Sequence, residues 1–137
     1  MMMRIMPLAA LFLAGCATSP AQQARAEAEQ ARTDAKLARA LAGLEPGQPQ
    51  SCIRPGQQGL KIFGDKLLYR DSGRRMYLNQ TSGGCAGLKR DDIIVTNSFT
   101  GQLCRGDIVR VVDRASRFPT GACSFGDFVP YTRPTRR

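Results

Sequence analysis

The stretch LKIFGDKLLYRDSGRRMYLN, residues 60–79, decides the fold class that the sequence predicts. It contains three short apolar or alternating runs, separated by Gly64-Asp65 and by Asp71-Ser72-Gly73. Glycine and aspartate are typical of tight turns, and short runs joined by tight turns predict antiparallel hairpins. In Arg75-Met76-Tyr77-Leu78 the polar and apolar residues alternate, which indicates a strand with one buried face.

The same pattern continues through residues 51–131. The predicted strands are 60–63, 66–70, 74–79, 92–98, 108–113 and 125–131. Thr100-Gly101 is predicted to turn the next pair of strands, and no amphipathic helix of useful length follows Gly43. Several short strands at this spacing predict a mainly β fold, a small antiparallel barrel or sandwich.

The cysteines divide into one near the N-terminus, Cys16, and four within the predicted β region. Those four are Cys52, Cys85, Cys104 and Cys123. An even number in an exported chain predicts two disulfides, and the residues alone leave all three pairings open. A domain of about 80 residues has only a modest hydrophobic core. Each bridge would therefore contribute to the stability of the fold, by roughly 4 kcal/mol from the entropy of loop closure.

The N-terminal segment has the layout of a secretory signal peptide. One positive charge, Arg4, precedes an apolar run that reaches Cys16 and is too short for a membrane span, which needs roughly 18 residues. Leu13-Ala14-Gly15-Cys16 resembles the lipobox of bacterial lipoproteins. This resemblance implies removal of residues 1–15 and a covalent diacylglycerol and acyl chain on Cys16. Ala17 in place of Asp favours the outer membrane, facing the periplasm, if the source is Gram-negative.

Residues 16–50 are predicted to hold the lipidated cysteine, a helical stalk and a linker. Ser19-Pro20, with Gln22 three residues after the serine, is typical of a capped helix start, and Gly43 ends the Ala-rich run 21–42. A heptad-like alanine stripe is formed by Ala24, Ala28, Ala31, Ala35, Ala38 and Ala42, and a second, short stripe by Leu37, Leu41 and Leu44. The alanines suggest a coiled-coil oligomer or a solvated spacer. We favour the spacer, followed by a flexible joint at residues 47–50.

Five segments of the β region are similar to a family of small exported proteobacterial proteins of unknown function. They are CIRPG, DKLLYRDSGRRMYLNQ, GGCAGL, LCRGDIVRVVD and GACSFGDFVPY. The resemblance implies the pairings Cys85–Cys123 and Cys52–Cys104. It carries no established activity.

The composition weighs against an enzyme. The chain has no histidine, which removes the commonest general base and the commonest metal ligand. We therefore expect no catalytic residues, no metal, and no cofactor beyond the lipid on Cys16.

The net charge of +9 points to acidic partners, and in an exported chain nucleic acid is not one of them. The candidate anion-binding residues are Arg70, Arg74, Arg75, Arg110 and Arg114, and a basic tail follows at residues 132–137.

The sequence thus predicts a non-enzymatic, lipid-anchored envelope protein with a periplasm-facing β domain that has a binding or structural role. One alternative is an inhibitor of a cell-wall-degrading enzyme, similar to the small lipid-anchored barrels that block lysozyme. The run from Ser72-Gly73 to Tyr77 comes near their motif, with one residue too many. The other alternative is a binder of anionic envelope polymer or glycolipid through an arginine-rich face.

Overall fold

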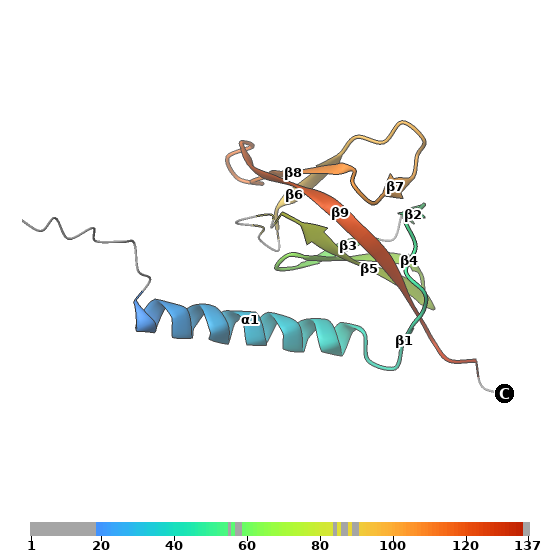
Figure 1. Cartoon of the computed structure of the whole chain (residues 1–137), viewed down its shortest axis with the longest axis horizontal. Helices are drawn as coiled ribbons and strands as arrows, with labels where there is room; N and C mark the ends of the chain where they lie inside the picture. The colour runs from blue at the N-terminus through green and yellow to red at the C-terminus, as the bar shows by residue number, and fades with distance from the viewer. Residues whose placement is uncertain are drawn as a thin grey trace, which may run out of the picture.

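The computed structural model describes residues 19–54, 56, 59–83, 85, 88 and 91–135. One helix, α1 (Pro20–Ala40), precedes the strands. These are β1 (Glu45–Pro46), β2 (Cys52–Ile53), β3 (Leu60–Phe63), β4 (Lys66–Ser72), β5 (Arg75–Ser82), β6 (Ile93–Thr96), β7 (Leu103–Cys104), β8 (Ile108–Val112) and β9 (Pro119–Thr132). The helix lies along one side of the strands (Figure 1). In the described part of the chain, no helix is both long and apolar enough to cross a membrane.

The main sheet is antiparallel throughout and curls into a half-barrel. Its strand order is β3-β4-β5-β9-β8-β6, and β1 adds to β9 outside this path. Strands β2 and β7 form a separate antiparallel pair. The prediction of a mainly β, antiparallel fold with two disulfides and one preceding helix is confirmed.

Strand β9 is the long strand that joins the two parts of the sheet. Its first half pairs with β8, and its second half lies between β5 on one side and residues 45–50 on the other. The amide of Gly47 donates to the Pro130 carbonyl at 2.7 Å, and the amide of Gln50 donates to the Phe128 carbonyl at 2.8 Å. The prediction of a flexible joint at residues 47–50 is therefore wrong, because β9 holds this segment by backbone hydrogen bonds.

Two of the three predicted turns join neighbouring strands. Gly64, at φ 63°, makes the two-residue turn between β3 and β4, and Gly73 turns β4 into β5 beyond a bulge. The third prediction is wrong. After Thr100-Gly101 the chain enters β7, which pairs with β2, whereas β6 pairs with β8. The cause is long-range, since Cys52 and Cys104 are paired across β2 and β7.

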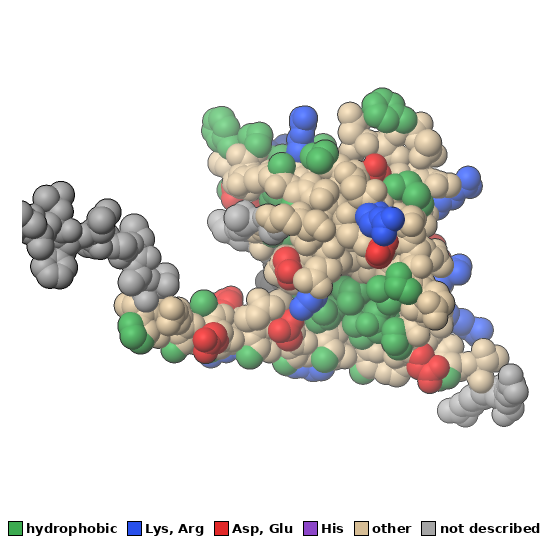
Figure 2. Space-filling view, in the orientation of Figure 1, with side chains coloured by type: hydrophobic (Ala, Val, Ile, Leu, Met, Phe, Trp, Pro, Cys, Tyr) green, Lys and Arg blue, Asp and Glu red, His purple; other side chains and the backbone are tan. Residues whose placement is uncertain are grey.

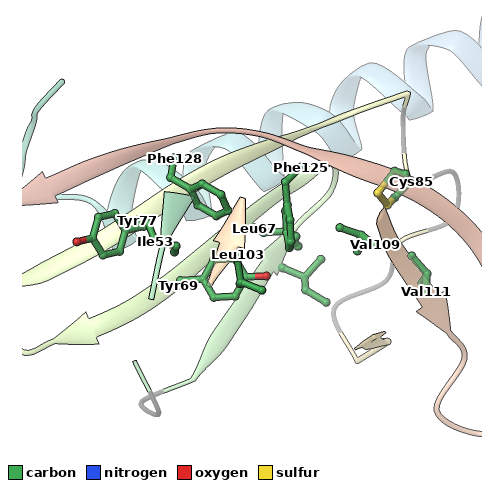
Figure 3. Packing of buried hydrophobic residues seen from close by; sticks show 12 residues of the cluster. Ile53, Leu67, Tyr69, Tyr77, Cys85, Leu103, Val109, Val111, Phe125 and Phe128 are labelled. Atoms are coloured by element: carbon green, nitrogen blue, oxygen red, sulfur yellow. A yellow bond between two sulfur atoms is a disulfide. The ribbon is translucent and has the colours of Figure 1, made fainter. Parts of the chain in front are cut away.

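The core fills the concave face of the half-barrel (Figure 3). The buried side chains come from nearly every strand: Ile53, Ile62, Leu67, Tyr69, Tyr77, Cys85, Leu103, Val109, Val111, Cys123, Phe125 and Phe128. Three aromatic rings form its centre, with centroids 5.3 Å apart for Phe125 and Phe128, and 6.2 Å from Tyr69 to each of them. Burial raises the pKa of the Tyr69 hydroxyl.

A bulge in β9 is held by one buried side chain. Asn79 is fully buried, and its Nδ2 donates to the carbonyls of Gly126 and Asp127 at 2.8 and 3.2 Å. Its Oδ1 accepts from the Gly126 amide at 3.3 Å. A side chain at position 126 would place its Cβ 2.3 Å from the Gln80 carbonyl oxygen, so only glycine fits there. The bulge bends β9, and bending of this kind curls a sheet.

The two disulfides have the pairing that the family resemblance implies. Cys52–Cys104 joins β2 to β7 with Cα atoms 4.0 Å apart, and Cys85–Cys123 attaches the segment before β6 to β9 with Cα atoms 5.1 Å apart. All four cysteines of the described residues are thereby used. Cys16 and the predicted lipobox lie outside the described residues.

Candidate functional site

The helix begins as the sequence predicts. Ser19 is the N-cap, and its side chain and that of Gln22 each accept a hydrogen bond from the other residue's backbone amide. The six alanines of the heptad stripe are exposed. The leucine stripe is not: Leu37 is buried, and Leu41 and Leu44 are half-buried. The second half of α1 is therefore docked rather than solvated, which corrects the spacer interpretation for this half.

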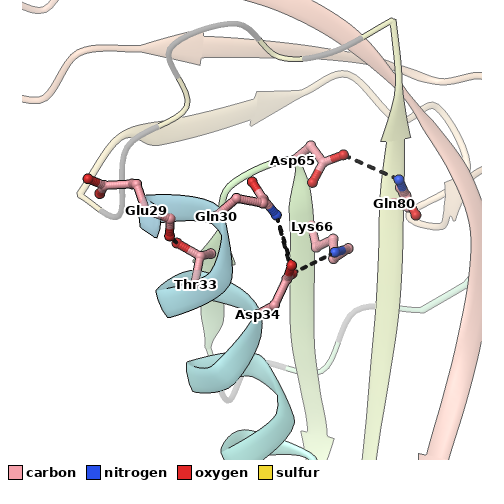
Figure 4. Close-up of polar contacts among 7 residues, drawn as sticks. All are labelled: Glu29, Gln30, Thr33, Asp34, Asp65, Lys66 and Gln80. Carbon is pink, nitrogen blue, oxygen red and sulfur yellow. Dashed lines mark hydrogen bonds and ion pairs between the residues drawn. The ribbon is translucent and has the colours of Figure 1, made fainter. Parts of the chain in front are cut away.

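The docking surface is the convex face of β3 and β4. Their register puts Leu68 on this face, opposite the core residues Leu67 and Tyr69, and Leu68 is nonetheless buried. A polar contact fixes the helix beside it: Lys66 Nζ lies 2.9 Å from Asp34 Oδ1 (Figure 4). The hydrogen bonds from Lys66 and Gln30 hold the pKa of Asp34 below its ordinary value. The pair therefore helps docking at neutral pH and is lost when acid protonates Asp34.

Substitution of Leu37 by serine is expected to release the second half of α1 from the sheet. The change removes the one buried side chain of the helix, and a serine hydroxyl at that place would lose most of its contact with water. We expect amide hydrogen exchange in residues 30–41 to accelerate at least tenfold while the core strands keep their protection. Ala31→Ser, at an exposed helical position, is the matched control. Unchanged exchange in Leu37→Ser would contradict the docking.

Two hollows flank the docked half of the helix, and we call them together the helix–sheet groove. The first, of about 430 Å³, is lined by Ala40, Gly59, Leu60, Lys61, Leu68, Arg70 and Met76. The second, of about 510 Å³, is lined by Lys36, Arg39, Ala40, Leu60, Lys61, Ile62 and Phe63. They share Ala40, Leu60 and Lys61 and so meet at the end of the helix. Figure 2 shows hydrophobic side chains gathered against this half of α1.

The groove combines an apolar floor with a purely basic lining. Leu68, Met76 and Phe63 supply apolar surface. The charged lining residues are Lys36, Arg39, Lys61 and Arg70, and among the described residues no acidic side chain lines either hollow. Among the ion pairs of the described residues, none includes any of these four. A hollow of this size with apolar walls and a few converging charges is typical of a small-molecule site, and this one would take an anionic amphiphile.

The predicted anion-binding arginines do not form one patch. Arg70 lines the groove, and Arg74 and Arg75 lie at the nearby turn of β4 and β5. Arg75 Nε is 2.9 Å from Asp71 Oδ2, and its guanidinium lies 5.8 Å from the centre of the Tyr77 ring.

The remaining two arginines lie toward the other end of β9. Arg75 pairs with Thr132 and Arg110 pairs with Ala122, so roughly 30 Å of strand separates the two groups. Arg114, just beyond β8, belongs with Arg110. Three groove residues were missed at the sequence level: Lys36, Arg39 and Lys61. Lys36 and Arg39, three residues apart beside the leucine stripe, were the available signal.

The fold and the groove define a small disulfide-braced half-barrel with a docked N-terminal helix. In comparisons with known proteins, a family model described as a family of unknown function (DUF6491) matches residues 1–127. The chain belongs to this family. No curated protein and no solved structure matches the chain. The matched range includes Cys16 and all of α1.

Proposed function

We propose that the chain is a non-enzymatic envelope protein, lipid-anchored to the outer membrane through Cys16, whose periplasm-facing domain binds an anionic amphiphile in the helix–sheet groove. The cysteines support the export that this requires. Disulfides persist in oxidising compartments, and the two bridges use the four downstream cysteines. Cys16 is then the odd cysteine, at the end of a lipobox-like tetrapeptide.

The observation that carries the binding role is the composition of the groove. In the part of the chain that the structure describes, four basic residues and no acidic one line the groove beside an apolar floor of leucine, methionine and phenylalanine. Cations that meet an anionic head group would form charge-assisted hydrogen bonds, and the floor would accept an alkyl chain. Among envelope components, this chemistry fits a lipid or glycolipid with a phosphate or carboxylate head.

Binding of lysophosphatidylglycerol, an anionic single-chain amphiphile, tests this role. The chain from Ala17 onward is titrated below the micellar concentration, with zwitterionic lysophosphatidylcholine as the reference ligand. We expect tighter binding of the anionic ligand. Lys61→Gln combined with Arg70→Gln should weaken it at least tenfold, because two charged hydrogen-bond donors leave the groove.

Arg25→Gln combined with Arg110→Gln removes the same charge from exposed positions outside the groove, on the first half of α1 and on β8, and is the matched control. It should leave the affinity unchanged. Equal losses in the two double variants would mean attraction by net charge alone, and the groove would not be the site.

The inhibitor hypothesis is the second candidate. Its motif places a tyrosine shortly after Ser-Gly, and a side chain must be accessible to contact another protein, whereas Tyr77 is only 8% exposed because it faces the core. We place it second for this reason. Titration of lysozyme activity with the same soluble chain tests it, and inhibition at micromolar concentration would move it to first place.

A further inference from the structure

The turn between β8 and β9, residues 113–118, is fixed by its own hydrogen bonds. The Asp113 amide donates to the Phe118 carbonyl at 3.0 Å, and the Arg117 amide donates to the Asp113 carbonyl at 2.9 Å. Asp113 Oδ1 accepts from the amides of Ala115 and Ser116 at 3.0 and 2.8 Å. Arg117 has a positive φ of 62°, which is rare outside glycine. The turn is thus a rigid element rather than a loose connection.

This turn presents an aromatic ring and two cations to solvent. Phe118 is 71% exposed, and Arg114 and Arg117 are exposed as well. Arg114 Nε donates to the backbone carbonyl of Asp91 at 2.9 Å, which orients its guanidinium. The one carboxylate within the turn, Asp113, is engaged by the amides of the turn itself. A phenylalanine flanked by arginines is the combination that binds at the boundary between anionic head groups and acyl chains.

The position of the turn agrees with a bilayer at this end of the molecule. In Figure 1 the turn from β8 to β9 projects toward the same end of the long axis as the first turn of α1, and the end of β9 lies toward the opposite end. Figure 2 shows hydrophobic side chains at the tip of this turn. Cys16 lies three residues before the N-cap Ser19. A lipid on Cys16 would therefore bring the start of α1 and the turn toward one surface.

We propose that the β8–β9 turn docks onto an anionic phospholipid bilayer, with the Phe118 ring at the base of the head groups and Arg114 and Arg117 against lipid phosphates. This contact adds a second point of attachment to the lipid anchor. Two points of attachment restrict how the domain is oriented above the membrane. The orientation step rests on the proposed anchor, whereas the chemistry of the turn does not.

A single tryptophan introduced at the turn reports on this docking, because the chain contains none. Phe118→Trp is compared with Phe99→Trp, whose parent side chain is 97% exposed beyond β6. Each lipidated chain is reconstituted into vesicles of phosphatidylglycerol and phosphatidylcholine. We expect the emission of Phe118→Trp to shift to the blue and to be quenched by brominated lipids, and Phe99→Trp to stay as in solution. A Phe118→Trp signal that equals that of Phe99→Trp overturns the proposal.

The charge requirement is tested in the same vesicles. Arg114→Gln with Arg117→Gln, in the Phe118→Trp background, should lower quenching to the level seen in pure phosphatidylcholine vesicles. Quenching that is insensitive both to these substitutions and to lipid charge overturns the role of the arginines.

A second arm of the experiment tests the turn in the absence of the lipid anchor. The chain from Ala17 onward, without lipid, is sedimented with the anionic vesicles. Phe118→Ser should weaken the affinity about tenfold, and Phe99→Ser should not change it. Mass spectrometry of the lipidated preparation reports Cys16 independently, so a missing lipid would contradict the proposed function while this arm still tests the turn. Equal losses for both serine variants in this arm would overturn the proposal, because any exposed phenylalanine would then suffice.

Discussion

Replacement of Cys85 and Cys123 together by alanine is expected to lower the free energy of unfolding by about 4 kcal/mol. The bridge closes a loop between residues 38 apart, and its loss gives that freedom back to the unfolded chain. Both sulfurs also lie in the core, since Cys85 and Cys123 belong to the buried cluster. Two alanines would leave part of that volume empty, which adds to the loss. Urea unfolding followed by far-UV circular dichroism measures the change.

The second bridge is the matched control. Cys52→Ala with Cys104→Ala opens a loop of 52 residues, for which the loop-entropy loss is the same within about 0.5 kcal/mol. These cysteines are more exposed than the first pair, so the cavity contribution should be smaller. The Cys85–Cys123 variant should therefore be the less stable one. The reverse order would contradict the assignment of that bridge to the core.

Phe128→Ala is expected to lower the free energy of unfolding by about 3–5 kcal/mol. The Phe128 side chain is fully buried, and its ring packs on Phe125 and Tyr69 at the centre of the core. Its backbone is equally central, because it pairs with Asn79 of β5 and exchanges hydrogen bonds with Gln50. Alanine keeps those backbone bonds and removes the ring, so the measured loss reports packing.

Two companion substitutions calibrate that loss. Phe128→Leu keeps most of the apolar volume and should be destabilised by less than half as much. Phe99→Ala removes a ring that is 97% exposed and should fall within about 0.5 kcal/mol of the parent chain. All three are compared by denaturant midpoint at constant m-value. A Phe99→Ala loss as large as that of Phe128→Ala would contradict the described core.

The sequence is most informative where structure is local. The run 60–79 predicts three strands and two turns because alternation and turn residues act over a few positions, and β3 begins and ends where predicted. The N-cap at Ser19 follows equally from neighbouring residues. The pairs β1–β9 and β2–β7 join segments more than 45 residues apart. Two-residue strands of this kind carry no periodicity, so long-range pairing alone creates them.

The groove could be predicted from the sequence only in part. Its residue types are legible in the sequence, but its existence depends on where α1 lies. The leucine stripe is visible in the sequence but short, and the prediction of a solvated spacer gave it no packing role. The structure turns the leucines toward the sheet and leaves the alanines exposed, because a leucine side chain gains far more free energy than an alanine from leaving water. The arginines were grouped as one possible basic face, and the sheet separates them because Arg70 and Arg110 lie on strands on either side of β9.

The place of strand β9 in the sequence limits how early the sheet can form. It pairs with β1, β5 and β8, and it is synthesised after all three because it follows them in the sequence. The nascent polypeptide therefore lacks the strand that joins β8 and β6 to the rest until residue 132 has left the ribosome. Contacts between such distant segments form slowly. This order would suit the proposed export, because the main sheet cannot close before β9 is present, and the bridge from Cys85 to Cys123 of β9 cannot form earlier.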